Sequence, residues 1–96
     1  MAILGTINKQ PREILDFDID YTTVLAGRTS ALTTATSEVT PSGLTLTSTT
    51  VYAPEKKVKV VINGGTDLTT YKVTILTNTD DGLKYEDEVN VVVEED

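Results

Sequence analysis

The feature that most constrains this chain is the alternation of apolar and polar side chains along its most regular stretches. Residues 15–21 place an apolar side chain at every second position and an aspartate at each position between. Successive side chains of a β-strand point to opposite faces, so a period of two residues predicts a strand that is buried on one face only. The same period recurs in residues 56–63, 71–75 and 85–93.

Turn-forming sequences separate these stretches. Pro41-Ser42-Gly43, Asn63-Gly64-Gly65-Thr66 and Asn78-Thr79-Asp80-Asp81-Gly82 combine residues that tolerate positive φ or initiate turns. We expect two further strands, one around residues 30–36 and one over residues 44–52. Short strands at this spacing, without helical periodicity, predict an all-β protein: an immunoglobulin-like β-sandwich of about six to seven antiparallel strands.

Length and composition agree with one small domain. The chain has 96 residues and about a fifth of them are Thr, a β-branched residue that favours pleated, half-buried surfaces. A chain of this size buries only roughly 60–70% of its unfolded surface. We therefore expect residues 13–96 to form a single β-sandwich domain with a thin core, whose net stability is small unless partner chains contribute.

Residues 1–12 differ from the rest and are predicted to form an N-terminal arm. The segment carries apolar Ile3, Leu4 and Ile7 and stops at Pro11. Such a segment forms a first strand, frays in solution, or docks on a neighbouring subunit by adding a strand. We take Ile3, Leu4 and Ile7 as candidate interaction residues. The segment lacks the basic region and sustained apolar stretch of a signal peptide, and none is expected.

Charge and residue usage exclude several functions. The net charge of −7 argues against nucleic acid as a partner, because phosphate binding needs clustered Lys and Arg. The chain has no His and no Cys, which removes the commonest general base, thiolate chemistry and Cys-type zinc sites. No run approaches the ~18 apolar residues of a membrane span. We predict a protein that is not an enzyme, needs no cofactor and binds neither nucleic acid nor membrane.

The aspartates of residues 15–21 invite comparison with a calcium loop. Asp16, Asp18 and Asp20 have the opening spacing of an EF-hand, but Tyr21 stands where that loop requires Gly and Gly27 where it requires a bidentate Glu. We interpret the three aspartates as an acidic stripe that faces solvent or the basic groups of a partner, and take them as candidate interaction residues. Whether the carboxylates around the last predicted hairpin bind calcium stays open at this point; they are Asp80, Asp81, Glu86, Asp87 and Glu88.

Several sequence stretches resemble a family of short bacteriophage virion proteins, described as fiber–tail adaptor or minor structural proteins. The resemblance lies in Lys9-Gln10-Pro11-Arg12 and the Asp-rich strand that follows, in the region from Gly27 to Val39 leading into Pro41-Ser42-Gly43-Leu44, and in Gly64-Gly65-Thr66 followed by Tyr71-Lys72-Val73-Thr74. It extends over most of residues 9–93. The chain departs from the family pattern at Arg28, where an acidic residue is usual, and at Tyr21-Thr22, where a Trp is usual.

The resemblance implies a virion structural protein without catalytic residues, located in the virion and assembled in the cytoplasm of the bacterial host. It implies that the chain joins or decorates virion components, as a fiber–tail adaptor or a head or tail completion protein. The expected partners are tail, fiber, portal or capsid subunits, with a homo-oligomer or symmetric array in the particle. The alternative is an immunoglobulin-like binding module that recognises a glycan or protein at the host surface.

Overall fold

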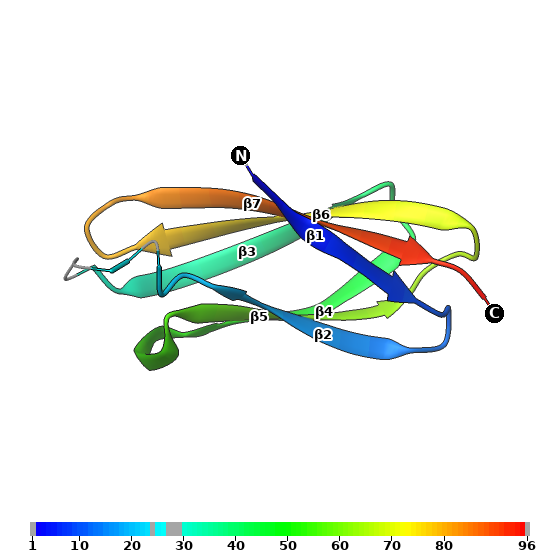
Figure 1. Ribbon diagram of the computed structural model, residues 1–96, viewed down its shortest axis with the longest axis horizontal. Helices are drawn as coiled ribbons and strands as arrows, with labels where there is room; N and C mark the ends of the chain where they lie inside the picture. Colours follow the sequence, from blue (N-terminus) through cyan, green and yellow to red (C-terminus); the bar gives the residue numbers. More distant parts are fainter. Residues whose placement is uncertain (1, 24, 27–29, 96) are drawn as a thin grey trace.

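The alternating stretches form strands that pack into a sandwich of two β-sheets (Figure 1). The computed structural model describes residues 2–23, 25–26 and 30–95. The elements are β1 (Ala2–Lys9), β2 (Ile14–Asp20), β3 (Leu32–Thr40), β4 (Leu44–Tyr52), the 3₁₀ turn η1 (Ala53–Glu55), β5 (Lys57–Gly64), β6 (Thr69–Thr79) and β7 (Lys84–Val93). Within the described ranges, no helix is long and apolar enough to cross a membrane.

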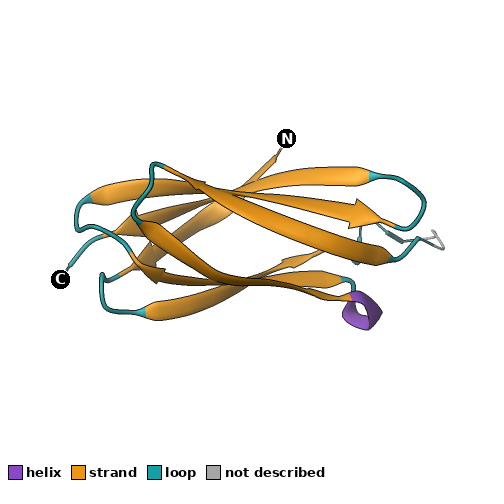
Figure 2. Cartoon of the chain, turned by 180° about the vertical axis from the view of Figure 1, so that it is seen from behind, coloured by secondary structure: helices purple, strands orange, loops and turns teal. Residues whose placement is uncertain are grey.

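The strand order is β1-β7-β6-β3 in one sheet and β2-β5-β4 in the other. Figure 2 shows the two layers from behind, with loops at both ends of an elongated molecule of 45 × 22 × 19 Å. Every pairing is antiparallel except that of β1 with β7. The immunoglobulin-like sandwich predicted from the sequence is therefore confirmed, with a first strand that runs parallel to the last.

The backbone of residues 2–9, expected to form an arm, is an edge strand of the four-stranded sheet. β1 pairs with β7 from Ala2↔Asp87 to Lys9↔Val93, with a register shift between Ile3 and Gly5. Of the possibilities given for this segment, it therefore forms a first strand, because the apolar stretch pairs with a free strand edge of its own chain. That the arm docks on a neighbouring subunit stays a prediction.

Lys9 fixes the turn that carries the chain from one sheet to the other. Its side chain is buried, and its Nζ donates hydrogen bonds to the carbonyl oxygens of Gln10, Pro11 and Gly64 at 2.8, 3.3 and 2.6 Å. Burial lowers the pKa of the Lys9 ammonium below its ordinary value, and the nearby Glu13 carboxylate opposes this. A charge-assisted hydrogen bond to Gly64 thus holds the β1–β2 turn against the end of β5.

The core fills the space between the sheets with side chains from alternate strand positions. Val and Ile dominate it, because β-branched side chains stack well on a pleated surface. The buried apolar residues are Ile19, Tyr21, Leu25, Leu32, Leu44, Val58, Val60, Ile62, Tyr71, Val73, Ile75, Val89, Val91 and Val93.

A polar cluster interrupts the core near Tyr21. The Tyr21 hydroxyl donates to Asp87 Oδ2 at 2.8 Å and lies 3.0 Å from Thr77 Oγ1, and the Tyr21 ring lies 5.6 Å from that of Tyr85. Burial raises the pKa of Tyr21 well above its ordinary value. Asp87 lies half-buried on the inner face of β7, because the Tyr21 hydroxyl satisfies its carboxylate there.

Tyr71 ties the start of β6 to the loop before it. The ring is buried, and its hydroxyl oxygen accepts the backbone N–H of Thr66 at 2.9 Å. This is the arrangement of the tyrosine corner of immunoglobulin-like sandwiches, in which a Tyr near the start of the sixth strand bonds the backbone a few residues upstream. A Cβ at Gly43 would lie 2.9 Å from the same hydroxyl, so Tyr71 also requires Gly at the β3–β4 turn.

Replacing Tyr71 with Phe removes this hydroxyl and leaves the Thr66 N–H without its partner. We expect the free energy of unfolding to fall by about 1 kcal/mol, the usual value for a lost hydrogen bond, measured by urea denaturation. Tyr52→Phe is the matched control, since Tyr52 is exposed, and should change stability by less than about 0.5 kcal/mol. Equal losses in the two variants would contradict the role of the Tyr71 hydroxyl.

Candidate interaction surface

The acidic stripe lies on the outer face of the three-stranded sheet. Strand alternation turns Phe17 and Ile19 toward the core and leaves Asp16, Asp18 and Asp20 exposed. β2 is an edge strand, paired only with β5. The stripe therefore borders a row of backbone N–H and C=O groups that point away from β5 and pair with no other strand among the described residues.

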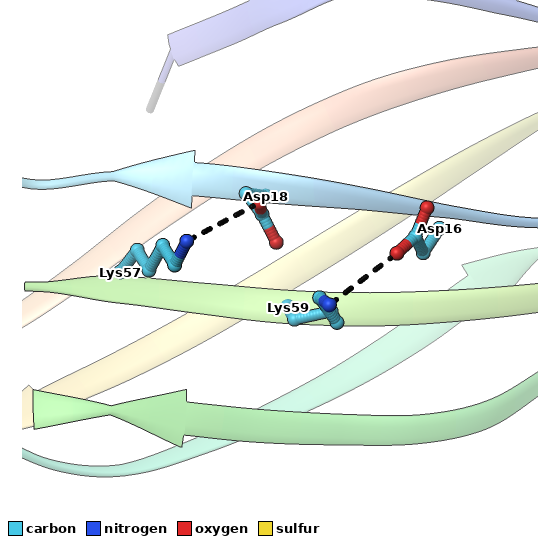
Figure 3. Close-up of polar contacts among 4 residues, drawn as sticks. All are labelled: Asp16, Asp18, Lys57 and Lys59. Carbon is cyan, nitrogen blue, oxygen red and sulfur yellow. Dashed lines mark ion pairs between the residues drawn. The ribbon is translucent and has the colours of Figure 1, made fainter. Parts of the chain in front are cut away.

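Two aspartates of the stripe pair with lysines of β5 (Figure 3). Lys57 Nζ lies 3.8 Å from Asp18 Oδ2, and Lys59 Nζ lies 3.5 Å from Asp16 Oδ2. The four side chains are between 33% and 58% exposed. Pairs as open to solvent as these contribute about 0–1 kcal/mol, so an approaching charged group can exchange with either partner. That the stripe contacts a basic partner stays a prediction.

Asp20 closes the stripe at the end of β2. Hydrogen bonds from the side chain and backbone N–H of Thr22 lower the pKa of Asp20 below its ordinary value, and the N–H lies 2.8 Å from Asp20 Oδ1. Asp20 is therefore ionised over the whole physiological range, and it also shapes the turn that follows the strand.

Lys59 connects the stripe to an aromatic side chain that sequence reasoning missed. Its Nζ lies 5.7 Å from the centre of the Tyr52 ring, within the range of a cation–π contact. Asp16, Lys59 and Tyr52 thus form a row across β2, β5 and β4. The sequence indicates this row once the register of the strands is known, since each of the three residues then occupies an outward position.

A notch opens between the two sheets beside β2. β1 and β2 share a turn and then diverge, each along the edge of its own sheet (Figure 1). The notch has a volume of about 180 Å³ and is lined by Gly5, Thr6 and Ile7 of β1, by residues 17–19 of β2, and by Val89 of β7. A Cβ at Gly5 would meet no atom within 4 Å, so there is open space beside this residue.

The opposite edges of the sheets close on each other. β3 and β4 lie in contact across the sandwich, and the hydroxyls of Ser37 and Thr49 lie 2.5 Å apart. The two long sides of the sandwich therefore differ: a polar contact seals the β3/β4 side, whereas apolar side chains line an opening on the β1/β2 side.

The structure brings together some of the residues singled out from the sequence. Ile7 is partly buried against the core and lines the same notch as Asp18. Asp16 and Asp20 flank it on the outer face of β2. The backbone of Ile3 and Leu4 belongs to β1, but their side chains lie outside the described part of the structure.

A second concave region lies where Lys9 is buried. It has a volume of about 350 Å³ and is lined mainly by polar residues: Asn8, Lys9, Gln10, Glu13, Val92 and Glu94. The Lys9 ammonium is already committed to three carbonyl oxygens, and Glu13 accepts the Gln10 backbone N–H at 2.7 Å. The polar groups that line this region therefore hold the β1–β2 turn in place.

The carboxylates of the β6–β7 hairpin also accept hydrogen bonds from neighbouring loop residues. Asp80 accepts the Ala31 N–H at 3.1 Å, and Asp81 accepts the hydroxyls of Ser30 and Thr79. Among the residues that the structure describes, no three Asp or Glu side chains are grouped closely enough to hold a metal ion.

A further acidic residue, Glu88, is buried on the outer face of the four-stranded sheet. Its Oε2 accepts no hydrogen bond but lies 3.3 Å from Nζ of Lys72, whose side chain is 49% exposed. We interpret this contact as a structural ion pair, because the cation balances a carboxylate that burial would otherwise destabilise.

Comparison with protein families identifies the chain. Residues 9–93 match the model of a family described as "Podophage GP4 fiber-tail adaptor protein gp77". The chain belongs to this family. The match begins at Lys9 and ends at Val93, the paired residues at one end of the β1–β7 ladder. The family is one of phage structural proteins, which supports a place in the virion and contacts with other virion components, and gives no sign of enzymatic activity.

A solved structure with a similar fold is the "Solution structure of the PKD domain from KIAA 1837 protein", at 19% sequence identity and a TM-score of 0.53. The match covers 96% of this chain and 80% of that chain. At this identity the likeness shows the immunoglobulin-like fold alone. No curated protein matches the sequence.

The ion pairs of the stripe can be tested by a double-mutant cycle of Asp16→Asn and Lys59→Met. We expect a coupling energy of about 0.5 kcal/mol at low salt, because both side chains are exposed, and its disappearance at 1 M NaCl, where charges are screened within about 3 Å. Free energies of unfolding measured by urea denaturation give the coupling. A coupling of 2 kcal/mol or more that persists at 1 M NaCl would contradict a labile surface pair.

Proposed function

We propose that this protein joins virion components and acts as an adaptor between the fibers and the tail of a phage particle. The observation that carries the proposal is the family match over residues 9–93, which includes nearly all of the sandwich. A role in head or tail completion, or in decoration of the capsid, belongs to the same class of function and is separated from the adaptor role by the experiment below.

The physical features of the chain support a role based on contact. An adaptor needs surfaces for two neighbours, and a two-sheet sandwich presents strand edges on both long sides. The thin core gains stability from every contact made in a particle, by mass action and by multivalency. The proposed partners are tail and fiber subunits, with copies of this chain arranged as a homo-oligomer or symmetric array, assembled in the host cytoplasm.

Particles produced without this protein test the role. We expect phage lacking the chain to form filled heads and tails but no attached fibers, and expression of the chain in the host to restore attachment, as seen by negative-stain microscopy. Quantitative mass spectrometry of normal particles should give a copy number that matches the symmetry of the tail. Hundreds of copies per particle, or fibers that remain attached without the chain, would contradict the adaptor role.

A binding module for a host-surface glycan or protein is the second candidate, favoured by the fold it shares with a PKD domain. The purified chain applied to a glycan array distinguishes the two. An adaptor gives no glycan signal above that of a denatured sample, whereas a selective signal that correlates with host range would favour the binding module.

A further inference from the structure

We propose that the notch between β1 and β2 receives an extended segment of a virion partner in which apolar and basic residues alternate. The segment adds to the free edge of β2 as a further strand. This inference rests on the proposed adaptor function, and it names the surface and the chemistry of the partner that the function requires.

The shape of the notch suits an apolar side chain. Its walls come from Ile7 of β1 and from Phe17 and Ile19 of β2, with Val89 of β7 also lining it. A dry cavity of about 150 Å³ is large enough to bind benzene. The notch volume of about 180 Å³ therefore accommodates one large apolar side chain.

The free edge of β2 supplies the hydrogen bonds. β2 pairs with β5 along one side only, so every second residue directs its N–H and C=O toward the space beside the notch. An extended segment laid along this edge completes these bonds by β-augmentation, the mode in which main-chain bonds give affinity and pockets for alternate side chains give specificity. On the other long side, the hydroxyls of Ser37 and Thr49 hold β3 and β4 together across the sandwich.

Strand alternation then fixes the chemistry of the partner. A strand added beside β2 places its inward side chains at the notch and its outward side chains next to Asp16, Asp18 and Asp20. Cross-strand neighbours lie about 4.5–5.5 Å apart, close enough for an ion pair, and like charges at this distance repel. Lys or Arg at the outward positions is therefore favoured, and an acidic segment is excluded.

The existing ion pairs of the stripe do not prevent this exchange. Asp16 and Asp18 hold their lysines at 3.5 and 3.8 Å on a surface that is largely solvated, and the chain as a whole carries a charge of −7. A basic segment thus meets a net negative protein and a row of ionised carboxylates along one edge. The same row blocks edge-to-edge association with neutral strands, which is a usual function of charges on edge strands.

Peptide binding to the full chain tests the proposal without the particle. The probes are the nine-residue peptides (Lys-Ile)4-Lys and (Glu-Ile)4-Glu, added to the isotope-labelled chain and followed by the amide NMR signals. We expect the basic peptide alone to bind, to shift the amides of residues 5–7 and 16–20, and to lose at least tenfold in affinity between 50 mM and 500 mM NaCl.

Two variants give the controls, each checked for an unchanged melting curve. Asp18→Lys should weaken binding at least tenfold, and Glu38→Lys should change it by less than twofold, because this equal charge reversal lies on exposed β3 at the other side of the sandwich. These positions keep the core intact, since Asp18 and Glu38 are both exposed.

Several results would overturn the proposal: equal binding of the acidic peptide, shifts confined to β3 and β4, or equal effects of Asp18→Lys and Glu38→Lys. Concentration-dependent dimers that Asp18→Lys abolishes, seen by sedimentation, would assign the notch to a second copy instead. Each of these results leaves the adaptor role standing if particles without the chain lack fibers. Attached fibers on such particles would refute the adaptor role whatever the peptides do.

Discussion

The packing of β-branched side chains between two sheets is the constraint on which the rest of this structure depends. Val58, Val60 and Ile62 of β5 are fully buried and face Val73 and Ile75 of β6 in the other sheet. Burial of each such side chain contributes about 1.5–3 kcal/mol, and polar groups do not replace it. The chain has a single Phe and no Trp, and Tyr21 and Tyr71 supply the aromatic rings buried in the described core. Because the inward side chains satisfy the fold, the outward ones carry the surface contacts.

The outward side chains define the two long sides of the molecule. On the β3/β4 side, hydroxyl groups bridge the sheets and close the sandwich. On the β1/β2 side, the turn held by Lys9 directs the two strands to different sheets, and an apolar notch remains between them. The acidic stripe follows the open side. The charge pattern of the stripe thus runs beside an apolar opening between the sheets.

Much of the fold was predictable from the sequence, because alternation and turn chemistry are local signals. Residues 15–21 and 56–63 lie within one residue of β2 and β5, and Pro41-Ser42-Gly43 joins β3 to β4. The strand expected around residues 30–36 is Leu32–Thr40, shifted because Thr-rich sequence has no clear alternation. The buried ammonium of Lys9 and the hydrogen bond between Tyr21 and the inward carboxylate of Asp87 were not predictable, since they join residues 55 and 66 positions apart.

The candidate surface was only partly predictable, for the same reason. The acidic stripe follows from strand alternation, but its pairing with Lys57 and Lys59 follows from the register of β2 on β5. The notch depends on the parallel pairing of β1 with β7, which no local pattern in residues 1–12 indicates. We propose that this chain acts by shape and edge contact at the joint between fiber and tail. A cryo-electron microscopy map of the intact particle would show this directly. We expect the sandwich to lie between tail and fiber, with an extended segment of a neighbour along β2. Placement on the capsid shell, or at the joint with β2 facing solvent in every copy, would contradict it.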